Sequence, residues 1–345
     1  MITLKEIAQQ CNVSIATVSN ILNGKAKVSN ETKERVLQII KETGYKPNYM
    51  ARLLRANKTR TIGVLVDDLT EFSSPLIVDG IMTYLEEHNY KTILENLRFY
   101  SKWGRDWYEN ADYKKSVYQA FQEFSAIKVD GIIYVSGHER NINIIPEEFN
   151  IPTVIGYAFS DSQNFSSVLI DDFDGAYKLT EYLIKKGHKK IALVQGIEGN
   201  IHTEERLRGF KAALKDHNLE ADPNLMLPGI WFPESGYEAC KKLIESKKDF
   251  SAIFCFNDLM AAGVYKYLTE KNLQVGKDIS VVGFDNRTIA EELIPSLTTM
   301  EIPLKEVGIS TAKELLDQMT SEEEFQKQEI YIKCNLIERA SVSNK

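Results

Sequence analysis

Apolar residues recur at helical spacing in three short stretches at the start of the chain, at 4–11, 14–23 and 29–43. Thr3 and Ser14 are suitable N-caps for the first two stretches, and Gly44 can end the third. Two short helices joined by a tight turn at residues 12–13 have the helix-turn-helix pattern, although a helical hairpin whose second helix merely packs would show the same spacing. The expected core of this three-helix unit consists of Leu4, Ile7, Val18, Leu22, Val36 and Ile40.

From Thr61 onwards the pattern changes to short, nearly continuous apolar runs that alternate with helical stretches. Such runs are typical of strands buried on both faces of a parallel sheet. Strands are expected at 62–66, 91–95, 131–135, 153–156, 167–170, 190–195, 252–256, 279–284 and 329–336. Helices are expected at 75–87, 113–128, 173–186, 204–216, 233–245, 258–271 and 304–318. The alternation predicts an α/β fold with two doubly wound sheets, which bind a ligand beyond the carboxyl ends of their strands.

Charge divides the chain into two unlike parts. Residues 1–60 contain eleven Lys or Arg and four Glu, a net charge of +7, whereas the whole chain carries −7. Residues 61–345 therefore carry −14. A small basic head on a large acidic body is expected where only the head meets phosphates, so nucleic acid is the predicted partner of the head.

Composition argues against several other classes of protein. No apolar run approaches the roughly 20 residues that span a bilayer, and Met1 leads directly into the first predicted helix, so we expect a cytoplasmic protein without membrane contact. The four cysteines are scattered among apolar neighbours, which predicts buried free thiols. The five histidines form neither a metal spacing nor a catalytic triad and should have surface or packing roles. No phosphate loop follows a strand, so we expect no enzyme activity, metal or cofactor.

Three runs near the N-terminus carry a specific resemblance. They read V-S-x-A-T-V-S-x-x-L-N-G from Val13, V-S-x-E-T-x-x-R-V from Val28 and G-Y-x-P-N-x-x-A-R-x-L from Gly44. In this order they resemble the headpiece of the lactose-repressor (LacI/GalR) family of bacterial transcription regulators. The resemblance continues to an R-x-S motif at Arg339 and so covers essentially the whole chain.

The resemblance implies that the second helix lies in the major groove of double-stranded DNA. Many members of the family have arginine at the position of Asn20. Because asparagine suits adenine and arginine suits guanine, we expect the base pair that Asn20 reads to be A·T. The implied contacts are Ile15, Ala16 and Asn20 with base edges, and Ser14, Thr17 and Ser19 with phosphates.

Residues 49–55 are too few for a helix that is stable alone, since isolated helices need about 12–15 residues. The resemblance implies a hinge helix that pairs with its symmetry mate in the minor groove, where Leu54 wedges between the central base pairs. The other interpretation is an ordinary basic linker with a buried leucine. The implied hinge contacts are those of Asn48, Ala51, Arg52, Leu54 and Arg55.

For the body, the resemblance implies a two-lobed, periplasmic-binding-protein-like domain that binds a small effector in the cleft. The R-x-x-G-F motif begins at Arg206, N-D-x-M-A-x-G begins at Asn257, and V-x-G-F-D ends at Asp285. These side chains supply charged and bidentate partners for vicinal hydroxyls, and Trp231 stands where the family often has a ligand-stacking aromatic. Each could instead be a satisfied polar group or packed aromatic at a lobe rim. The first lobe departs further from the family, and its candidates are Asp68, Phe72, Ser74 and Tyr157.

The length of 345 residues points to at least two domains. We expect a helix-turn-helix headpiece at 1–46, a hinge helix and linker at 47–60, and an effector-binding and dimerisation domain at 61–345. In the resembling family the chain crosses between the lobes three times. The implied lobes are 61–160 with 291–320, and 161–290 with 321–345.

The connection at residues 95–128 is longer than the usual family link. It could form part of the effector site or a lid over it, or pack on its own lobe as an extra helical turn. Its aromatic residues include Phe99, Tyr100, Trp103, Trp107 and Tyr108.

Together these observations predict a sequence-specific repressor that reads a pseudo-palindromic operator as a homodimer. A small effector, with a sugar or sugar derivative favoured, would control its affinity for DNA. The alternatives are control by a nucleobase, a sugar phosphate or a protein co-regulator. A solute-binding protein of a transporter would share the body, but it would have a signal segment and no basic headpiece.

Overall fold

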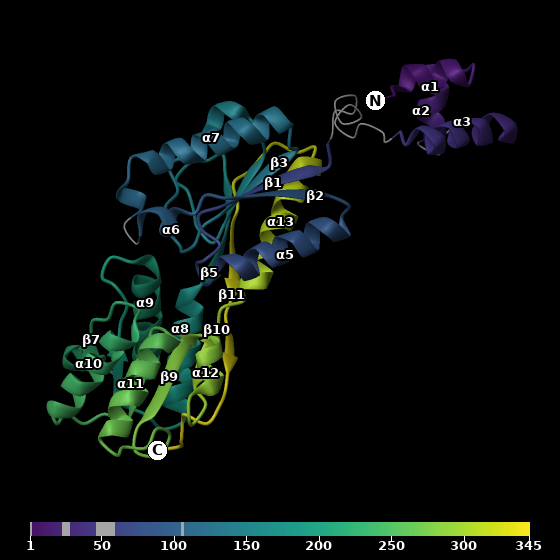
Figure 1. The fold of residues 1–345 in the computed structure, drawn as a ribbon. Helices are drawn as coiled ribbons and strands as arrows, with labels where there is room; N and C mark the ends of the chain where they lie inside the picture. The colour runs from purple at the N-terminus through teal and green to yellow at the C-terminus, as the bar shows by residue number, and fades with distance from the viewer. Residues whose placement is uncertain (1, 23–27, 46–58, 105–106) are drawn as a thin grey trace. The chain divides into compact units, whose positions relative to one another are not determined.

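The computed structural model describes residues 2–22, 28–45, 59–104 and 107–345 (Figure 1). The chain forms two units, residues 1–59 and 60–345. Each unit has its own apolar core. The predicted fold class, a small all-α headpiece followed by an α/β body with two sheets, is confirmed.

The first unit contains three helices, α1 (Leu4–Gln10), α2 (Ile15–Leu22) and α3 (Asn30–Thr43). Thr3 caps α1 in a reciprocal capping box with Glu6. Gly44 ends α3 in the left-handed conformation, with φ 60°. Three residues of the predicted core are only partly buried and pack at the edge of the observed core: Leu4, Leu22 and Ile40. The buried core consists of Ile7, Ala8, Cys11, Val18, Ile21 and Val36.

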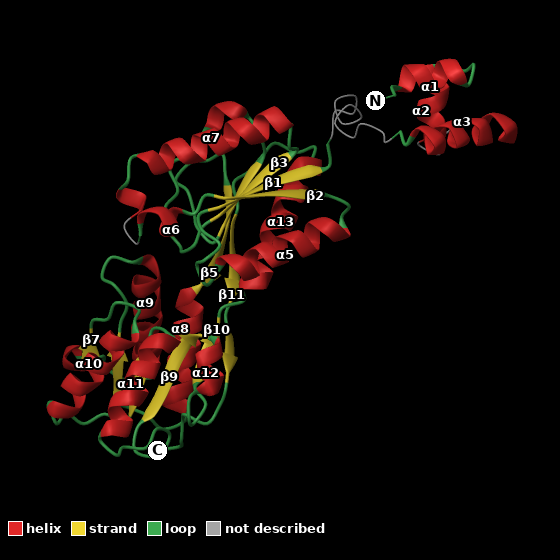
Figure 2. Ribbon diagram, viewed as in Figure 1, coloured by secondary structure: helices red, strands yellow, loops and turns green. Residues whose placement is uncertain are grey.

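The first lobe of the body is built on a six-stranded parallel sheet in the order β11-β5-β4-β3-β1-β2. Its strands are β1 (Thr61–Val66), β2 (Lys91–Asn96), β3 (Gly131–Val135), β4 (Thr153–Gly156), β5 (Ser166–Asp171) and β11 (Glu329–Lys333). Its helices are α5 (Ser74–Glu87), α6 (Phe99–Trp103), α7 (Asp112–Ile127) and α13 (Leu304–Thr320), with short 3-10 turns η1 (Trp107–Glu109) and η2 (Glu147–Phe149). Figure 2 shows α7 on one face of the sheet, and α5 and α13 on the other. Because helices cover both faces, β1 and β3 are buried along their whole length.

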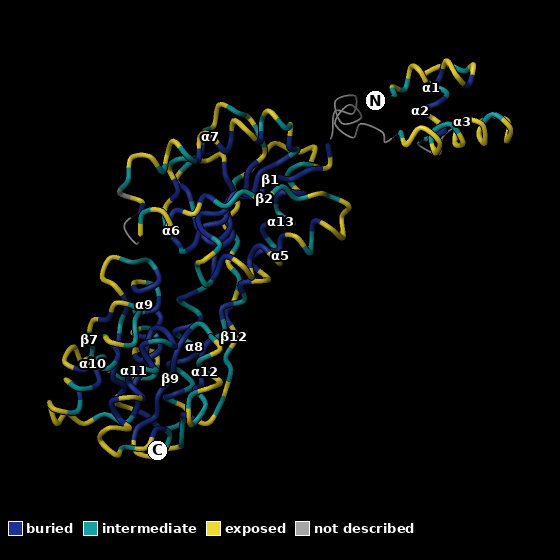
Figure 3. Tube along the Cα trace, in the orientation of Figure 1, coloured by how far each residue is buried: buried dark blue, intermediate teal, exposed yellow. Residues whose placement is uncertain are grey.

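The second lobe has a six-stranded sheet in the order β12-β10-β9-β8-β6-β7, in which β12 runs antiparallel to β10. Its strands are β6 (Ile191–Val194), β7 (Met226–Leu227), β8 (Ala252–Cys255), β9 (Ser280–Asp285), β10 (Thr298–Glu301) and β12 (Asn335–Ile337). Its helices are α8 (Asp172–Lys185), α9 (Ile201–Asp216), α10 (Pro233–Glu245), α11 (Asp258–Glu270) and α12 (Thr288–Glu292), with the 3-10 turn η3 (Pro223–Leu225). Figure 3 shows the central strands buried and the outer helical surfaces exposed.

Helices α5 and α13 cross at very short distance. A Cβ atom on Gly308 would lie 2.0 Å from the carbonyl oxygen of Ile77, and one on Gly80 would lie 2.1 Å from that of Lys305. Only glycine permits this approach of the two backbones. The two helices therefore form one layer against the first sheet.

The chain crosses between the lobes at points that differ from those expected. Because β5 pairs with β4, the first crossing follows Asp171 and not residue 160. Because β10 pairs with β9 in the second sheet, the second crossing falls near Ile302 and not near residue 290. The last predicted strand is divided at Cys334 into β11 in the first sheet and β12 in the second, so the C-terminal segment does not belong wholly to lobe 2. A hydrophobic run predicts a strand but not its partner, which long-range pairing decides.

All four cysteines are buried and free, as predicted. Within the described parts of the chain, none of the helices combines the length and the apolar content that a membrane crossing requires.

Candidate functional site

The candidate base-reading surface is the exposed face of α2. Val18 and Ile21 are buried in the headpiece core. Ile15 is 41% exposed, and Ala16 and Asn20 are exposed as well. The helix therefore presents the three residues expected to read bases on the side that faces away from its core.

Ser14 begins α2. Its Oγ accepts a hydrogen bond from the Thr17 N–H at 3.0 Å and lies 2.8 Å from Thr17 Oγ1, which is the geometry of an N-cap. Thr17 and Ser19 are half-buried at the edge of the exposed face. The hinge residues Asn48, Ala51, Arg52, Leu54 and Arg55 lie outside the residues that the structure describes.

Arg206 is the centre of a buried charge network in the second lobe. It lies on α9, is 2% exposed, and its Nε donates to Asp172 Oδ1 at 2.6 Å. Its Nη1 donates to the Phe256 carbonyl oxygen and lies 3.5 Å from Asp285 Oδ1. The guanidinium carbon lies 3.7 Å from the centroid of the Phe284 ring, a close cation–π contact.

The two carboxyl groups beside Arg206 differ in their ionisation. Burial opposes ionisation of Asp172, but Arg206 and His202 together hold the pKa of Asp172 below its ordinary value. Burial raises the pKa of Asp285 to about 8, even though the same arginine lies nearby. We attribute the difference to geometry, because Asp172 has the shorter, direct hydrogen bonds.

Asn257 holds the loop that carries Trp231. Its Oδ1 accepts from the Met260 N–H at 2.9 Å and so caps α11. Its Nδ2 donates to the Trp231 carbonyl oxygen at 3.0 Å. The Trp231 ring centroid lies 5.8 Å from the guanidinium carbon of Arg206. The two residues are therefore next to the charge network, and their contact with a ligand stays a prediction.

On the first lobe, Asp68 is already fully hydrogen-bonded. It is 1% exposed; Oδ1 accepts from the N–H and hydroxyl of Thr70, and Oδ2 accepts from the N–H and hydroxyl of Ser101, at 2.8 to 2.9 Å. Burial opposes its ionisation, but these four bonds hold the pKa of Asp68 below its ordinary value. Ser74 is buried in the first turn of α5, and its Oγ has no partner among the described residues.

A second polar cluster spans both lobes. Tyr157 follows β4, is 2% exposed, and its ring centroid lies 5.6 Å from that of His202. His202 Nδ1 lies 2.6 Å from Asp172 Oδ2, and its Nε2 accepts from the Glu139 N–H at 3.3 Å. Glu139, Asp172 and His202 each offer one atom that could bind a metal ion. These three atoms all lie within 4.8 Å of one another. The fold therefore buries His202 and brings it against two carboxyl groups far away in sequence.

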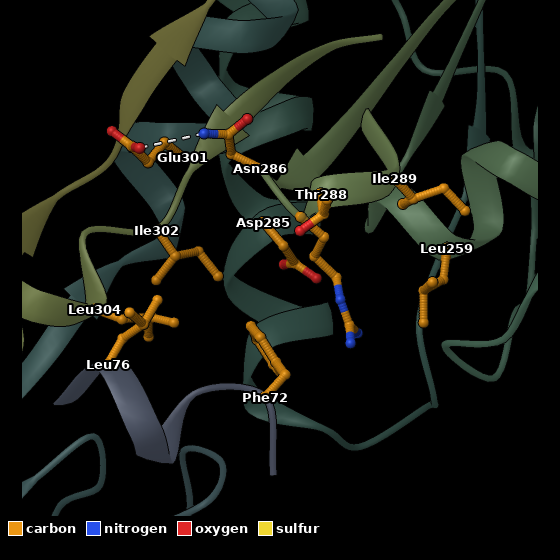
Figure 4. A pocket seen from close by; sticks show the side chains of 11 residues that line it. Phe72, Leu76, Leu259, Asp285, Asn286, Thr288, Ile289, Glu301, Ile302 and Leu304 are labelled. Atoms are coloured by element: carbon orange, nitrogen blue, oxygen red, sulfur yellow. Dashed lines mark hydrogen bonds between the residues drawn. The ribbon is translucent and has the colours of Figure 1, made fainter. Parts of the chain in front are cut away.

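A pocket of about 470 Å³ opens between the lobes (Figure 4). Phe72 lines it from the first lobe and Asp285 from the second, so two of the predicted residues face the same space. The guanidinium carbon of Arg287 lies 4.7 Å from the centroid of the Phe72 ring and so crosses the cleft. The apolar part of the lining comes from Leu76, Leu259, Ile289, Ile302 and Leu304.

The aromatic segment after β2 packs on its own lobe. Phe99 and Trp107 are buried and stack with ring centroids 4.8 Å apart. The guanidinium carbon of Arg140 lies 4.5 Å from the Trp107 ring. Ser101, in the same segment, provides two of the four bonds to Asp68. The segment therefore belongs to the core of the first lobe and also positions a residue at the end of β1.

Four side chains in these clusters were not predicted: Glu139, Asp172, His202 and Arg287. Asp172 follows β5 directly, so a carboxylate at the end of a strand was the available signal. Glu139 and His202 carry no such signal, because their meeting depends on how the two lobes contact each other.

Two family profiles match the chain. One, described as bacterial regulatory proteins of the lacI family, matches residues 3–48. The other, described as a periplasmic binding protein-like domain, matches residues 180–342. The matches agree with the headpiece and with most of the second lobe.

Relatives match over the full length. The HTH-type transcriptional repressor PurR of Vibrio atlanticus (strain LGP32) is 32% identical over 344 residues, which cover 99% of each chain. The HTH-type transcriptional regulator RegA of Clostridium saccharobutylicum is 32% identical over 341 residues, which cover 98% of each.

Solved structures show the same architecture. The lac repressor dimer bound to operator and the anti-inducer ONPF has a TM-score of 0.77 and 25% identity and covers 99% of both chains. The transcriptional regulator CelR in complex with cellobiose has a TM-score of 0.65 and 28% identity and covers 99% of this chain and 100% of its own. The chain therefore belongs to the lacI family of bacterial regulatory proteins, which are transcription regulators and not enzymes.

Proposed function

We propose that the protein is a repressor that binds a pseudo-palindromic operator as a homodimer and changes its DNA affinity when a small effector binds between the lobes. The observation that carries the proposal is the combination of an exposed α2 face with an interlobe pocket that is lined by Asp285, the neighbour of the buried Arg206. The solved lac repressor dimer is bound to operator and to a small molecule, which supports the same combination here. A solute-binding protein would have no helix-turn-helix headpiece.

The proposed effector is a sugar or sugar derivative. Arg206 and Asp285 lie side by side and can pair with vicinal hydroxyls, while Trp231 offers a ring beside them for stacking. Similar regulators have been solved with cellobiose and with ribose. A nucleobase, a sugar phosphate and a protein co-regulator are the other classes that the experiment below compares.

The proposed mechanism is a two-state change of the lobes. Two contacts join the lobes: the Glu139 N–H donates to His202 Nε2 at 3.3 Å, and the Arg287 guanidinium carbon lies 4.7 Å from the Phe72 ring centroid. An effector that binds one lobe arrangement better shifts the population towards it. In a dimer that shift would change the affinity of the protein for its operator.

The first experiment selects operator DNA from a random library with the purified chain and measures affinity by fluorescence anisotropy. We expect a pseudo-palindrome with A·T at the pair read by Asn20. Ala16→Glu should abolish binding, because it places a carboxylate on the exposed face of α2 against phosphates. Gln38→Glu, which adds the same charge to an exposed site on α3, is the matched control.

The second experiment adds sugars, sugar phosphates and nucleobases to the protein–operator complex. We expect one class to change operator affinity, by at least about fivefold for an ordinary allosteric coupling. Unchanged affinity with every compound would contradict control by a small effector. Failure of the purified protein to select any DNA sequence would contradict the proposed function itself.

A further inference from the structure

Arg287 brings an unbonded guanidinium group to the pocket between the lobes. It follows β9 on the second lobe, and its guanidinium carbon lies 4.7 Å from the centroid of the Phe72 ring on the first. Its backbone N–H donates to Asp258 Oδ2 at 2.7 Å, but none of the residues that the structure describes forms an ion pair or a hydrogen bond with its side chain. Two other arginines of this lobe, Arg206 and Arg339, do form ion pairs. Arg287 is therefore a half-buried cation whose N–H donors are open to a ligand.

The backbone that presents Arg287 is held in place from both sides. The two residues before it, Asp285 and Asn286, have positive φ angles of 108° and 53°. The side chain of Asn286 accepts from Arg339 Nη2 at 2.8 Å and donates to Glu301 Oε1 at 3.2 Å, a bond drawn in Figure 4. A group on a fixed backbone loses less conformational freedom on binding, which favours a ligand contact at this position.

The two acidic side chains that line the pocket leave the guanidinium group without a counter-charge. Burial raises the pKa of Asp285 to about 8, so that its carboxyl group is mostly protonated at neutral pH and can donate a hydrogen bond. The carboxylate of Glu301 accepts from two asparagine side chains, at 3.2 and 3.4 Å. Figure 4 shows this carboxylate well apart from Phe72, over whose ring Arg287 lies.

Glu71 on the first lobe is a poor counterion for Arg287. Burial raises the pKa of Glu71, Asp68 and Asp67 act in the same direction, and Arg287 opposes them only in part. The side chain of Glu71 packs towards Gly137, where an added Cβ atom would lie 2.7 Å from Glu71 Cγ, and it does not line the pocket. A bound anion would therefore meet a cation that its own surroundings do not neutralise.

A carboxylate or phosphate group fits this arrangement. Either one can accept two parallel N–H···O bonds from the edge of a planar guanidinium group. Stacking on Phe72 uses the face of the guanidinium group and leaves that edge available, so both contacts can exist together. Leu76 and Ile302 add apolar surface for the C–H groups of the same ligand.

We propose that Arg287 forms an anion subsite in the pocket between the lobes, so that the effector is a sugar acid or a sugar phosphate whose charged group binds the guanidinium. The inference rests on the proposed function, because it concerns the same interlobe effector. A neutral sugar could occupy the pocket but would leave the charge of Arg287 uncompensated. The anion thus distinguishes acidic effectors from their neutral parents.

The first test uses inorganic phosphate as the probe and needs no knowledge of the effector. The melting temperature of the full chain is measured in about 10 mM sodium phosphate and in sodium chloride of equal ionic strength. We expect phosphate to raise the melting temperature of the wild type by about 2 °C more than that of Arg287→Gln. Arg287→Lys should keep part of the difference, because it retains the charge but not the planar fork.

The second test compares sugars by isothermal titration calorimetry at constant ionic strength. The panel contains glucose, galactose, mannose and ribose, each with its sugar acid and its terminal phosphate ester. We expect at least one acid or phosphate to bind about tenfold or more tightly than its neutral parent, the range of a hydrogen bond to a charged group. Which of the two binds tighter identifies the anion. Arg287→Gln should remove the preference.

Arg208→Gln is the matched control in both tests. It removes the same charge from the same lobe, but Arg208 is exposed and pairs with Glu205 on α9. It should keep both the phosphate shift and the preference for the acid. A phosphate shift that depends on Arg287 supports the subsite even where no sugar of the panel binds.

Three results would overturn the inference. In the first, phosphate raises the melting temperatures of wild type and Arg287→Gln equally. In the second, a neutral sugar binds as tightly as its acid and its phosphate; in the third, Arg287→Gln keeps the preference for the acid. Operator binding, measured in parallel, separates these failures from failure of the proposed function: a protein that binds its operator and responds to a neutral sugar remains an effector-controlled repressor.

Discussion

At the scale of single residues, Arg206 has a structural role that is as important as its proposed contact with effector. It is 2% exposed, and its side chain neutralises Asp172 in a region without bulk water. Removing one partner of a buried ion pair leaves the other charge uncompensated, which is among the most destabilising single changes. A loss of ligand binding in an Arg206 variant would therefore not by itself locate the effector.

We predict that Arg206→Ala lowers the free energy of unfolding by about 3 to 5 kcal/mol, as measured by urea denaturation. Arg208→Ala, two residues further along α9, is the control: its side chain is 67% exposed and pairs with Glu205, so its loss should cost about 1 kcal/mol or less. Similar losses for the two variants would show that the buried network contributes little.

Asp285 should make stability fall as pH rises. Burial raises its pKa to about 8 in the folded state, whereas an exposed aspartate has a pKa of about 3.9. The folded state therefore favours the protonated carboxyl. The free energy of unfolding that this preference adds is fully present below pH 4 and is lost as the pH rises from about 4 to 8. The decline from this one group is at most about 1.4 kcal/mol per pH unit.

We predict that Asp285→Asn reduces the loss of stability between pH 5 and 8, relative to the wild type, in urea denaturation at each pH. The amide cannot ionise, so the difference between the two proteins should grow steadily with pH in this window. Thr288→Ala, at an exposed site in the same pocket, controls for a general effect of mutating the lining. Parallel pH profiles for wild type and Asp285→Asn would mean that Asp285 is ionised throughout.

At the scale of elements, the aromatic side chains of α6 and η1 fill part of the core of the first lobe. Phe99 stacks on Trp107, and Tyr113 at the start of α7 meets both rings edge-on. Arg140 lies over Trp107 and forms an ion pair with Asp67 at 2.7 Å. The extra length of this connection therefore fills the core beside the end of β1.

We predict that Trp107→Ala destabilises the protein by about 3 to 5 kcal/mol, the usual cost of truncating a buried aromatic residue. Tyr108→Ala is the control, because Tyr108 is the next residue but is 46% exposed. Urea denaturation would measure both. If Trp107→Ala were as stable as the wild type, the segment could not be part of the core.

At the scale of the whole molecule, the proposed dimer needs an apolar surface on the body. Met82 on α5 is 45% exposed, and Leu94 on the adjoining edge strand β2 is 38% exposed. Exposed apolar side chains gathered on neighbouring elements are typical of an interface between subunits. We therefore expect this face of the first lobe to contribute to the dimer.

We predict that the protein sediments at twice the chain mass of 39.3 kDa and that Met82→Glu shifts it towards the monomer. Operator affinity should fall in the same variant, because each half-site would be bound separately. Tyr118→Glu, at a 40% exposed site on α7 on the opposite face of the sheet, should leave the dimer intact. A dimer that tolerates Met82→Glu would place the interface elsewhere.

The fold class and most of the elements followed from the sequence, because local patterns carry that information. Capping residues at Thr3 and Gly44 and the apolar runs of the parallel strands act within a few residues along the chain. The motifs at Arg206 and Asp285 pointed to two residues that the fold brings to within 3.5 Å of each other. The α2 residues expected to read bases do face away from the headpiece core.

The tertiary structure alone decided which strands pair and which polar groups meet. The separation of β11 and β12 at Cys334 depends on hydrogen bonds to strands more than 30 residues away in sequence. The cluster of Glu139, Asp172 and His202 likewise assembles only where the two lobes touch. Short-range propensity fixes an element, whereas partners distant in sequence are selected by packing and long-range pairing, which no local pattern encodes.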